Sequence, residues 1–225
     1  MNTKKIALIF VIFLIACLGT GEVYGKEYIR KYEVKITNLT SGQIFSPPIV
    51  ITHKPDFTLF NLGEMASDEL AALAEEGNTG PLANLVNDYS NTSYSVAGGP
   101  ILPGDTAVIE VTAKPGAWTI SLAGMLVTTN DAFFAVRSMV IPALGKKEIT
   151  AEAYDAGTEY NSEDCTYIPG PPCNSHNSHD PTEAEGYVYI HSGIHGSGLD
   201  PEMVNPSQFD WRNPVALVTV RRIHN

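Results

Sequence analysis

The chain has 225 residues, 25 of them acidic and 14 basic, which gives a formal net charge of −11 at pH 7. Such an acidic surface repels nucleic acid and attracts cations, so we expect no nucleic-acid partner. The length suits one large domain or two small ones. Because all-β domains often reach this size as one unit, we expect a single domain over residues 26–225.

The first 25 residues have the layout of a signal peptide. Lys4 and Lys5 precede an apolar run that ends by Gly19, and this run is shorter than the ~20 residues that a helix needs to cross a bilayer. Two processing sites compete: a small-residue site that ends at Gly25, and a lipobox-like run that ends at Cys17. We expect export to the periplasm, the cell surface or the medium, with membrane attachment only through a lipid on Cys17.

Alternating hydrophobic and polar residues predict a series of half-buried β-strands. In the first, Tyr32, Val34 and Ile36 share one face, and polar residues share the other. Further segments have strand signals, and most are bounded by Gly, Pro or Asn turns. They are Ile49–His53, Thr106–Thr112, Ala117–Thr128, Phe133–Val140, Glu148–Ala153, Tyr187–His191 and Val215–Ile223.

Two short helices are predicted after the second of these strands. Ser67 can cap the first helix, Leu70 and Leu73 supply its apolar side, and Gly77 can end it. The second helix would start with Pro81. Many strands with one or two short helices inserted indicate a mainly β fold, an antiparallel β-sandwich with a helical insertion.

A long surface loop is expected between Asp155 and Glu185, where the chain is rich in Asn, Ser, Pro, Gly and Asp. Loops of this length are usually functional or mobile. Cys165 and Cys173 lie within it. In an exported protein they favour a local disulfide over two free thiols, and this bond would stabilise the fold by about 2–3 kcal/mol.

Acidic residues gather at the start of this loop. Asp155, Glu159, Glu163 and Asp164 follow a predicted strand, and Asp131 lies between two other strands. Calcium takes six to eight oxygen ligands, which such loops can supply if they lie at the same end of the sandwich. The alternative is a set of solvated acidic loops held by Asx turns.

Five stretches, in this order along the chain, resemble the spondin domain of extracellular matrix proteins. Each stretch is unspecific alone, but the ordered set is far less so, and it spans residues 32–223, so the resemblance extends over nearly the whole mature chain. The stretches are Gly42–Val50, Leu59–Leu70, Asn130–Phe133, Tyr154–Glu159 and Asp210–Pro214.

The resemblance implies a β-sandwich similar to a C2 domain and a calcium ion as its cofactor. It assigns the ligands to Asp131, Asp155 and Glu159 by their match to the family's two acidic loops. Glu159 stands where the animal pattern has Asp, and Thr129–Phe133 replaces a Pro-Ser-Pro-Asp-Trp-Phe sequence.

Histidines form a rival set of metal ligands. His176, His179, His191 and His195 have His-x-x-His and His-x-x-x-His spacings, which can bind zinc or copper. The alternative is ordinary loop histidines, with His191 and His195 hydrogen-bonded to backbone. Trp118 could stack against sugars, but a tryptophan among strand residues favours a place in the core.

We therefore expect an exported, non-enzymatic calcium-binding module for adhesion or ligand binding, with no catalytic residue. Its partner would be an unknown extracellular protein or polysaccharide. The alternative is an extracellular or periplasmic hydrolase that uses loop carboxylates or histidines. A purely structural envelope lipoprotein is a third interpretation.

Overall fold

A computed structural model describes residues 28–175, 179–196 and 202–223. The signal peptide and Cys17 lie outside the described residues, as does His176. The strands are β1 (Arg30–Asn38), β2 (Ile49–His53), β3 (Ser93–Val96), β4 (Thr106–Ala113), β5 (Thr119–Met125), β6 (Ala132–Val140), β7 (Lys146–Asp155), β8 (Tyr189–Ile190) and β9 (Ala216–Ile223). The helices are α1 (Asp68–Glu76), α2 (Gly80–Asp88) and α3 (Pro206–Phe209).

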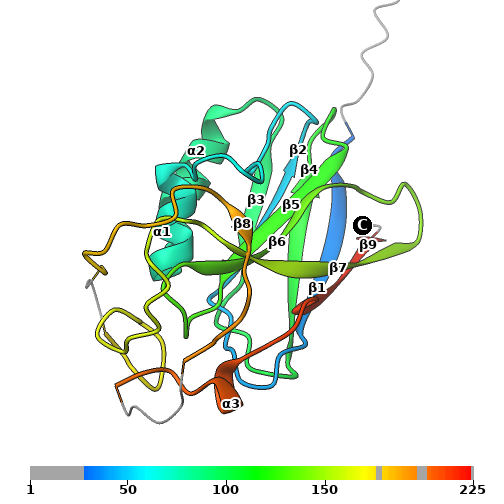
Figure 1. The fold of residues 1–225 in the computed structure, drawn as a ribbon. Coiled ribbons are helices and arrows are strands. Elements are labelled where there is room, and N and C mark those ends of the chain that lie inside the picture. Colours follow the sequence, from blue (N-terminus) through cyan, green and yellow to red (C-terminus); the bar gives the residue numbers. More distant parts are fainter. Residues whose placement is uncertain (1–27, 176–178, 197–201, 224–225) are drawn as a thin grey trace, which may run out of the picture.

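The strands form one antiparallel sheet in the order β3-β2-β5-β6-β7-β9-β1-β4, with β8 paired to β7. β7 belongs to both halves of this sheet, because residues 146–151 pair with β9 and residues 152–155 pair with β6. The two ends of this order come close together, because Thr52 of β2, the strand next to edge strand β3, donates a hydrogen bond of 2.6 Å to the carbonyl of Thr112 in edge strand β4. The sheet thus curves into a nearly closed sandwich (Figure 1), which confirms the predicted fold class.

The core between the two halves of the sheet follows from the alternation in β1. Tyr32, Val34 and Ile36 are fully buried, as the pattern predicts. They belong to one apolar cluster with Phe45 and Phe134, whose rings stack with centroids 4.2 Å apart. β1 is an interior strand of the sheet, because β4 pairs with one of its edges and β9 pairs with the other.

Both predicted helices form, and both pack on the outside of the sheet (Figure 1). The Ser67 hydroxyl accepts a 3.3 Å hydrogen bond from the amide of Leu70, and Gly77 ends α1 in a left-handed conformation. Leu70 and Leu82 are buried in a second apolar cluster, which includes Phe133 of β6. The helices therefore cover the face of the sheet that points away from the main core. None of the described helices is long and apolar enough to cross a membrane.

The expectation that Trp118 lies in the core is wrong, because its side chain is 57% exposed. Its backbone bonds to His53 on one side and Ile141 on the other, so the residue is part of an extended segment. Its neighbours Ala117 and Thr119 are buried. Since side chains alternate along such a segment, Trp118 must point outward, where the Arg30 guanidinium lies 4.4 Å from its ring centre.

Candidate functional site: a buried aspartate pair and a neighbouring Glu-Glu-His cluster

Asp131 and Asp155 meet at one end of the sandwich. Asp131 directly precedes β6, Asp155 is the last residue of β7, and Ala132 pairs with Asp155 across the two strands. The amide of Ala156 also donates a 3.2 Å hydrogen bond to the Asp131 carbonyl. Both aspartates are fully buried. The register of β6 and β7 thus places the two predicted loops side by side.

The two oxygens of Asp131 have different surroundings. Oδ2 accepts hydrogen bonds from the backbone amides of Thr158, at 2.8 Å, and Glu159, at 3.1 Å, and from the Thr158 hydroxyl at 3.2 Å. Oδ1 is buried and has no hydrogen-bond partner among the described residues. A buried carboxylate oxygen without a partner is unfavourable unless a cation or proton compensates it.

The pKa values of the two aspartates also indicate that the pair favours a bound proton or cation. Burial raises the pKa of Asp131 well above its ordinary value, and the nearby charge of Asp155 raises it further. Burial also raises the pKa of Asp155 to about 6, against the opposing effect of hydrogen bonds from Asn161 and Gly157. Two adjacent buried carboxylates without a counterion therefore favour their protonated forms, and a bound cation would favour the ionised forms.

The turn after Asp155 requires a glycine. The amide of Gly157 donates a 2.8 Å hydrogen bond to Asp155 Oδ1, and Gly157 has φ +66°. A Cβ on Gly157 would lie 2.3 Å from the carbonyl oxygen of Tyr187. The turn therefore brings the loop back against the segment that precedes β8, and it places the amides of Thr158 and Glu159 beside Asp131.

The second oxygen of Asp155 faces a buried polar network. Asn161 donates a 2.6 Å hydrogen bond to Asp155 Oδ2, and its own carbonyl oxygen lies 3.1 Å from His191 Nε2. His191 Nδ1 accepts a 3.0 Å bond from the amide of Gly193, so the proton of the neutral ring is on Nε2. Burial lowers the pKa of His191 to about 4. The expected backbone bond of His191 is confirmed.

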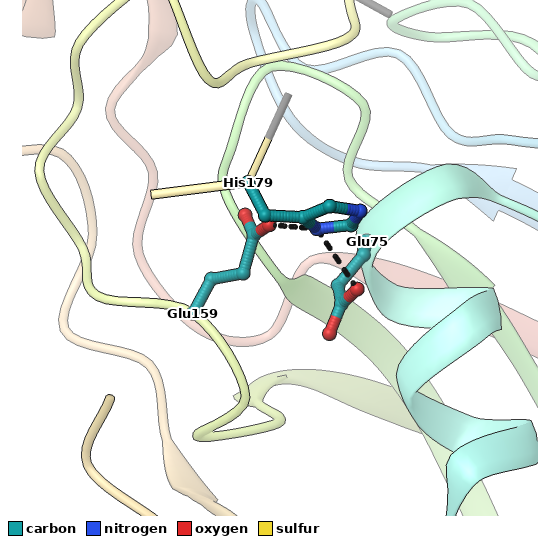
Figure 2. A group of neighbouring side chains, drawn as sticks. All are labelled: Glu75, Glu159 and His179. Carbon is teal, nitrogen blue, oxygen red and sulfur yellow. Dashed lines mark hydrogen bonds and ion pairs between the residues drawn. The ribbon is translucent and has the colours of Figure 1, made fainter. Parts of the chain in front are cut away.

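Glu159 is nearly buried, but its carboxylate turns away from the aspartate pair. Oε1 contacts Nδ1 of His179, and the same nitrogen lies 3.3 Å from Oε2 of Glu75 (Figure 2). Within the described ranges these three residues form a group whose donor atoms all lie within 4.8 Å of one another, and neither Asp131 nor Asp155 belongs to it. We refer to Glu75, Glu159 and His179 as the Glu-Glu-His cluster.

Charge is concentrated in this cluster. Burial raises the pKa of Glu159 to about 7, although the bond to His179 opposes the shift. Burial alone would lower the pKa of His179, but the hydrogen bond to Glu159 and the charges of Glu159 and Glu75 raise it. These contacts therefore favour the protonated form of His179, which balances part of the negative charge of the two carboxylates.

Two further acidic residues of the loop, Glu163 and Asp164, accept hydrogen bonds from backbone amides. Glu163 Oε1 accepts a 2.6 Å bond from the amide of His195, and its other oxygen accepts from Gly196. Asp164 accepts a 2.8 Å bond from the amide of Thr166, which is an Asx turn. The side chain of His195 lies 3.0 Å from the Ser192 hydroxyl, and within the described part of the chain it has no hydrogen bond to backbone of the kind expected.

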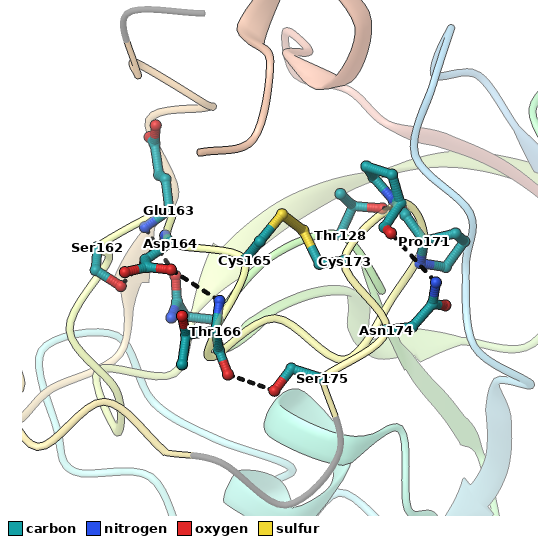
Figure 3. Close-up of a disulfide and its surroundings, with 12 residues drawn as sticks. Thr128, Ser162, Glu163, Asp164, Cys165, Thr166, Pro171, Cys173, Asn174 and Ser175 are labelled. Carbon is teal, nitrogen blue, oxygen red and sulfur yellow. Dashed lines mark hydrogen bonds between the residues drawn. A yellow bond between two sulfur atoms is a disulfide. The ribbon is translucent and has the colours of Figure 1, made fainter. Parts of the chain in front are cut away.

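The predicted disulfide between Cys165 and Cys173 is present, with Cα atoms 4.7 Å apart (Figure 3). It closes the segment in which Pro171 accepts a 2.8 Å hydrogen bond from the Thr128 hydroxyl. This bond attaches the disulfide segment to the chain between β5 and β6, three residues before Asp131. The disulfide therefore fixes the long loop beside the aspartate pair.

Sequence reasoning missed Glu75, because its position on α1 gives no sign that the long loop returns to this helix.

Comparison with known proteins supports the resemblance to the spondin domain. The family model Spondin_N matches residues 25–194, which is more than half of the chain. A search of curated proteins finds no significant match. The match contains both aspartates and the whole Glu-Glu-His cluster, and the chain therefore belongs to the Spondin_N family of extracellular modules.

Proposed function

We propose that the protein is an exported, non-enzymatic binding module whose aspartate pair holds a calcium ion. The observation that carries this proposal is Oδ1 of Asp131, a fully buried carboxylate oxygen with no described partner, beside the buried carboxylate of Asp155. A cation between them would provide the missing partner and remove the repulsion that raises the pKa of Asp131.

The donor set suits calcium better than a softer metal. Asp131 and Asp155 offer only oxygens, and calcium prefers carboxylate and carbonyl oxygens in flexible coordination. The nearest histidine of the network, His191, presents a protonated Nε2 to Asn161 and so has no free nitrogen on that side. We propose Glu159 as the third ligand, since its backbone amide already bonds to Asp131 and its carboxylate has a second oxygen besides the Oε1 that contacts His179.

The ion would join the loop before β6 to the loop after β7 and so shape one end of the sandwich as a contact surface. An extracellular protein or polysaccharide is the partner that we propose for this surface. Membership of a family of extracellular modules supports this role, and the disulfide supports an oxidising compartment. A lipid on Cys17 or cleavage at Gly25 would set whether the module stays attached to a membrane.

Calcium titration by calorimetry tests the site, together with melting curves of the chelated protein at rising calcium concentration. We expect saturable binding that raises the melting temperature in the wild type and that is lost in Asp131→Asn and Asp155→Asn. Asp105→Asn is the matched control, because Asp105 is an exposed aspartate, whereas both members of the pair are buried. Absence of binding up to about 10 mM calcium, above the weak extracellular range, would refute the proposal.

A further inference from the structure

The Glu-Glu-His cluster brings together donors from three separate parts of the chain. Glu75 lies in the last turn of α1, Glu159 follows the turn after β7, and His179 lies in the loop beyond the disulfide. Figure 2 shows the imidazole between the two carboxylates, with Nδ1 directed at both. The donor atoms of the three side chains all lie within 4.8 Å of one another.

We propose that Glu75, Glu159 and His179 form a site for a divalent transition-metal ion, with Zn²⁺ as the best-suited ion, separate from the calcium proposed at the aspartate pair. Imidazole is a common ligand of zinc and of its neighbours in the first transition row, whereas calcium and magnesium prefer oxygen alone. Zinc bonds of 2.0–2.1 Å in a tetrahedron place neighbouring donors roughly 3.3 Å apart. His179 Nδ1 and Glu75 Oε2 are 3.3 Å apart, whereas Glu159 Oε1 lies closer to Nδ1, as a hydrogen-bond partner, and would move away from it on metal binding.

The burial of the three ligands suits three protein bonds and one open position. The side chain of Glu159 is 4% exposed and that of Glu75 is 16% exposed, while that of His179 is 50% exposed. The site is therefore enclosed from the side of the sheet and open beside the imidazole. Structural zinc sites are closed by four protein ligands. A reactive or bridging zinc site has three protein ligands and leaves the fourth position for water or an external ligand.

The end of α1 gives independent support for a cation here. The last turn of a helix exposes carbonyl groups with a partial negative charge, and a basic side chain often compensates it. The last turn of α1 has no basic residue and contains Glu75 and Glu76 instead. A metal bound through Glu75 would supply the missing positive charge, and it would clip the long loop to the helix.

The two proposed sites meet at Glu159. Its backbone amide bonds to Asp131, and its carboxylate contacts His179. Glu75 and His179 belong to the zinc site alone, whereas Asp131 belongs to the calcium site alone. Variants of these residues can therefore separate the two proposals.

The inference is tested by calorimetric titration of zinc into the metal-free, disulfide-bonded protein. The absorption spectrum of bound Co²⁺ is a second readout of imidazole and carboxylate ligation. We expect one saturable zinc site in the wild type, and at least about tenfold weaker binding in Glu75→Gln and in His179→Gln. Glu76→Gln and His195→Gln are the matched controls, because both residues are exposed and lie outside the cluster. These controls should bind zinc like the wild type.

Calcium titrations of the same variants separate the outcomes. Asp131→Asn should lose calcium but keep the zinc site, and Glu75→Gln should lose zinc but keep calcium. Near-wild-type melting temperatures of the metal-free variants would show that they fold. Wild-type zinc affinity in folded His179→Gln or Glu75→Gln, or no saturable zinc binding at all, would overturn the inference whether or not calcium binds.

Discussion

The aspartate pair and the Glu-Glu-His cluster lie in the same part of the molecule but are built in different ways. The aspartates stand at the ends of two paired strands, where the hydrogen bonds of β6 and β7 set their separation. The cluster joins a helix to two parts of a long loop, and no strand pairing fixes its geometry. The first site is thus determined by sheet register, and the second depends on how the loop is held.

Gly157 is common to both sites, and its substitution should have the largest effect. Gly157→Ala forces a Cβ to within 2.3 Å of the Tyr187 carbonyl at φ +66°. We expect a loss of about 3 kcal/mol in the free energy of unfolding, from strain and overpacking together, with loss of both calcium and zinc binding. Urea denaturation measures the first and calorimetry the second.

Gly63→Ala is the matched control for this change. Gly63 also has a positive φ, of +80°, but a Cβ there would meet nothing within 4 Å. It should lose only about 1 kcal/mol, the cost of the backbone conformation. An equal loss in the two variants would show that the contact with Tyr187 does not constrain the turn.

Removing the disulfide should affect the two proposed metal sites to different extents. We expect the double variant Cys165→Ser with Cys173→Ser to lose about 2–3 kcal/mol of stability, because the unfolded chain gains freedom. Zinc affinity should fall, since His179 follows Cys173 on the same loop, while calcium affinity should change little, since the aspartates lie at strand ends. Parallel titrations of both ions on the variant measure this difference. An equal fall in both affinities would mean that the aspartate pair also depends on the loop.

A smaller effect is expected from pH in the metal-free protein. The folded-state pKa of Asp155, about 6, lies above its ordinary value of 3.8, so the folded state binds this proton more tightly than the unfolded state. As the pH falls from 7.5 to 4, the wild type should gain stability relative to Asp155→Asn, on the order of 2 kcal/mol. Saturating calcium should remove this gain, because it favours the ionised carboxylate. Denaturation of both proteins in chelator at several pH values measures the difference, and parallel profiles would contradict it.

The smallest effect should come from Trp118, at the opposite end of the sandwich from both sites. Its ring is largely exposed and contacts the Arg30 guanidinium. Trp118→Ala should lose only about 0.5–1 kcal/mol, the range of an exposed cation–π contact, and should leave both metal affinities unchanged. A change in calcium or zinc binding would show that the ends of the sandwich are coupled.

Local chemistry explains which parts of the fold could be predicted from the sequence. The bounds of α1 follow from the Ser67 cap and from Gly77, and those of β2 from its apolar run. β3 was missed because Ser93–Val96 is short and half polar, and its pairing with β2 stabilises it rather than its own pattern. The outward direction of Trp118 depends on which face of the extended segment meets the core, which composition does not reveal.

The two sites likewise differ in how far they could be predicted from the sequence. The resemblance to the spondin domain predicts that Asp131 and Asp155 lie together, whereas the strand pattern alone leaves open whether their loops are at the same end of the sandwich. Glu75 could not be joined to Glu159 and His179, since that contact depends on the path of the long loop across the helix. Residue types indicated metal chemistry, but only the tertiary fold decided that one histidine meets two glutamates.

The strand pairing places the two ends of the described chain at one pole of the sandwich and the aspartate pair at the other. Lys146 at the start of β7 pairs with Arg221, and Lys31 near the start of β1 pairs with Ile223, so both ends of the described chain emerge at one pole. Asp155 ends β7 nine residues later, up to about 30 Å away at the rise of a strand. A tether joined to β1 or β9 would therefore leave the loops of the two proposed metal sites at the far pole, facing away from any surface to which that tether is attached.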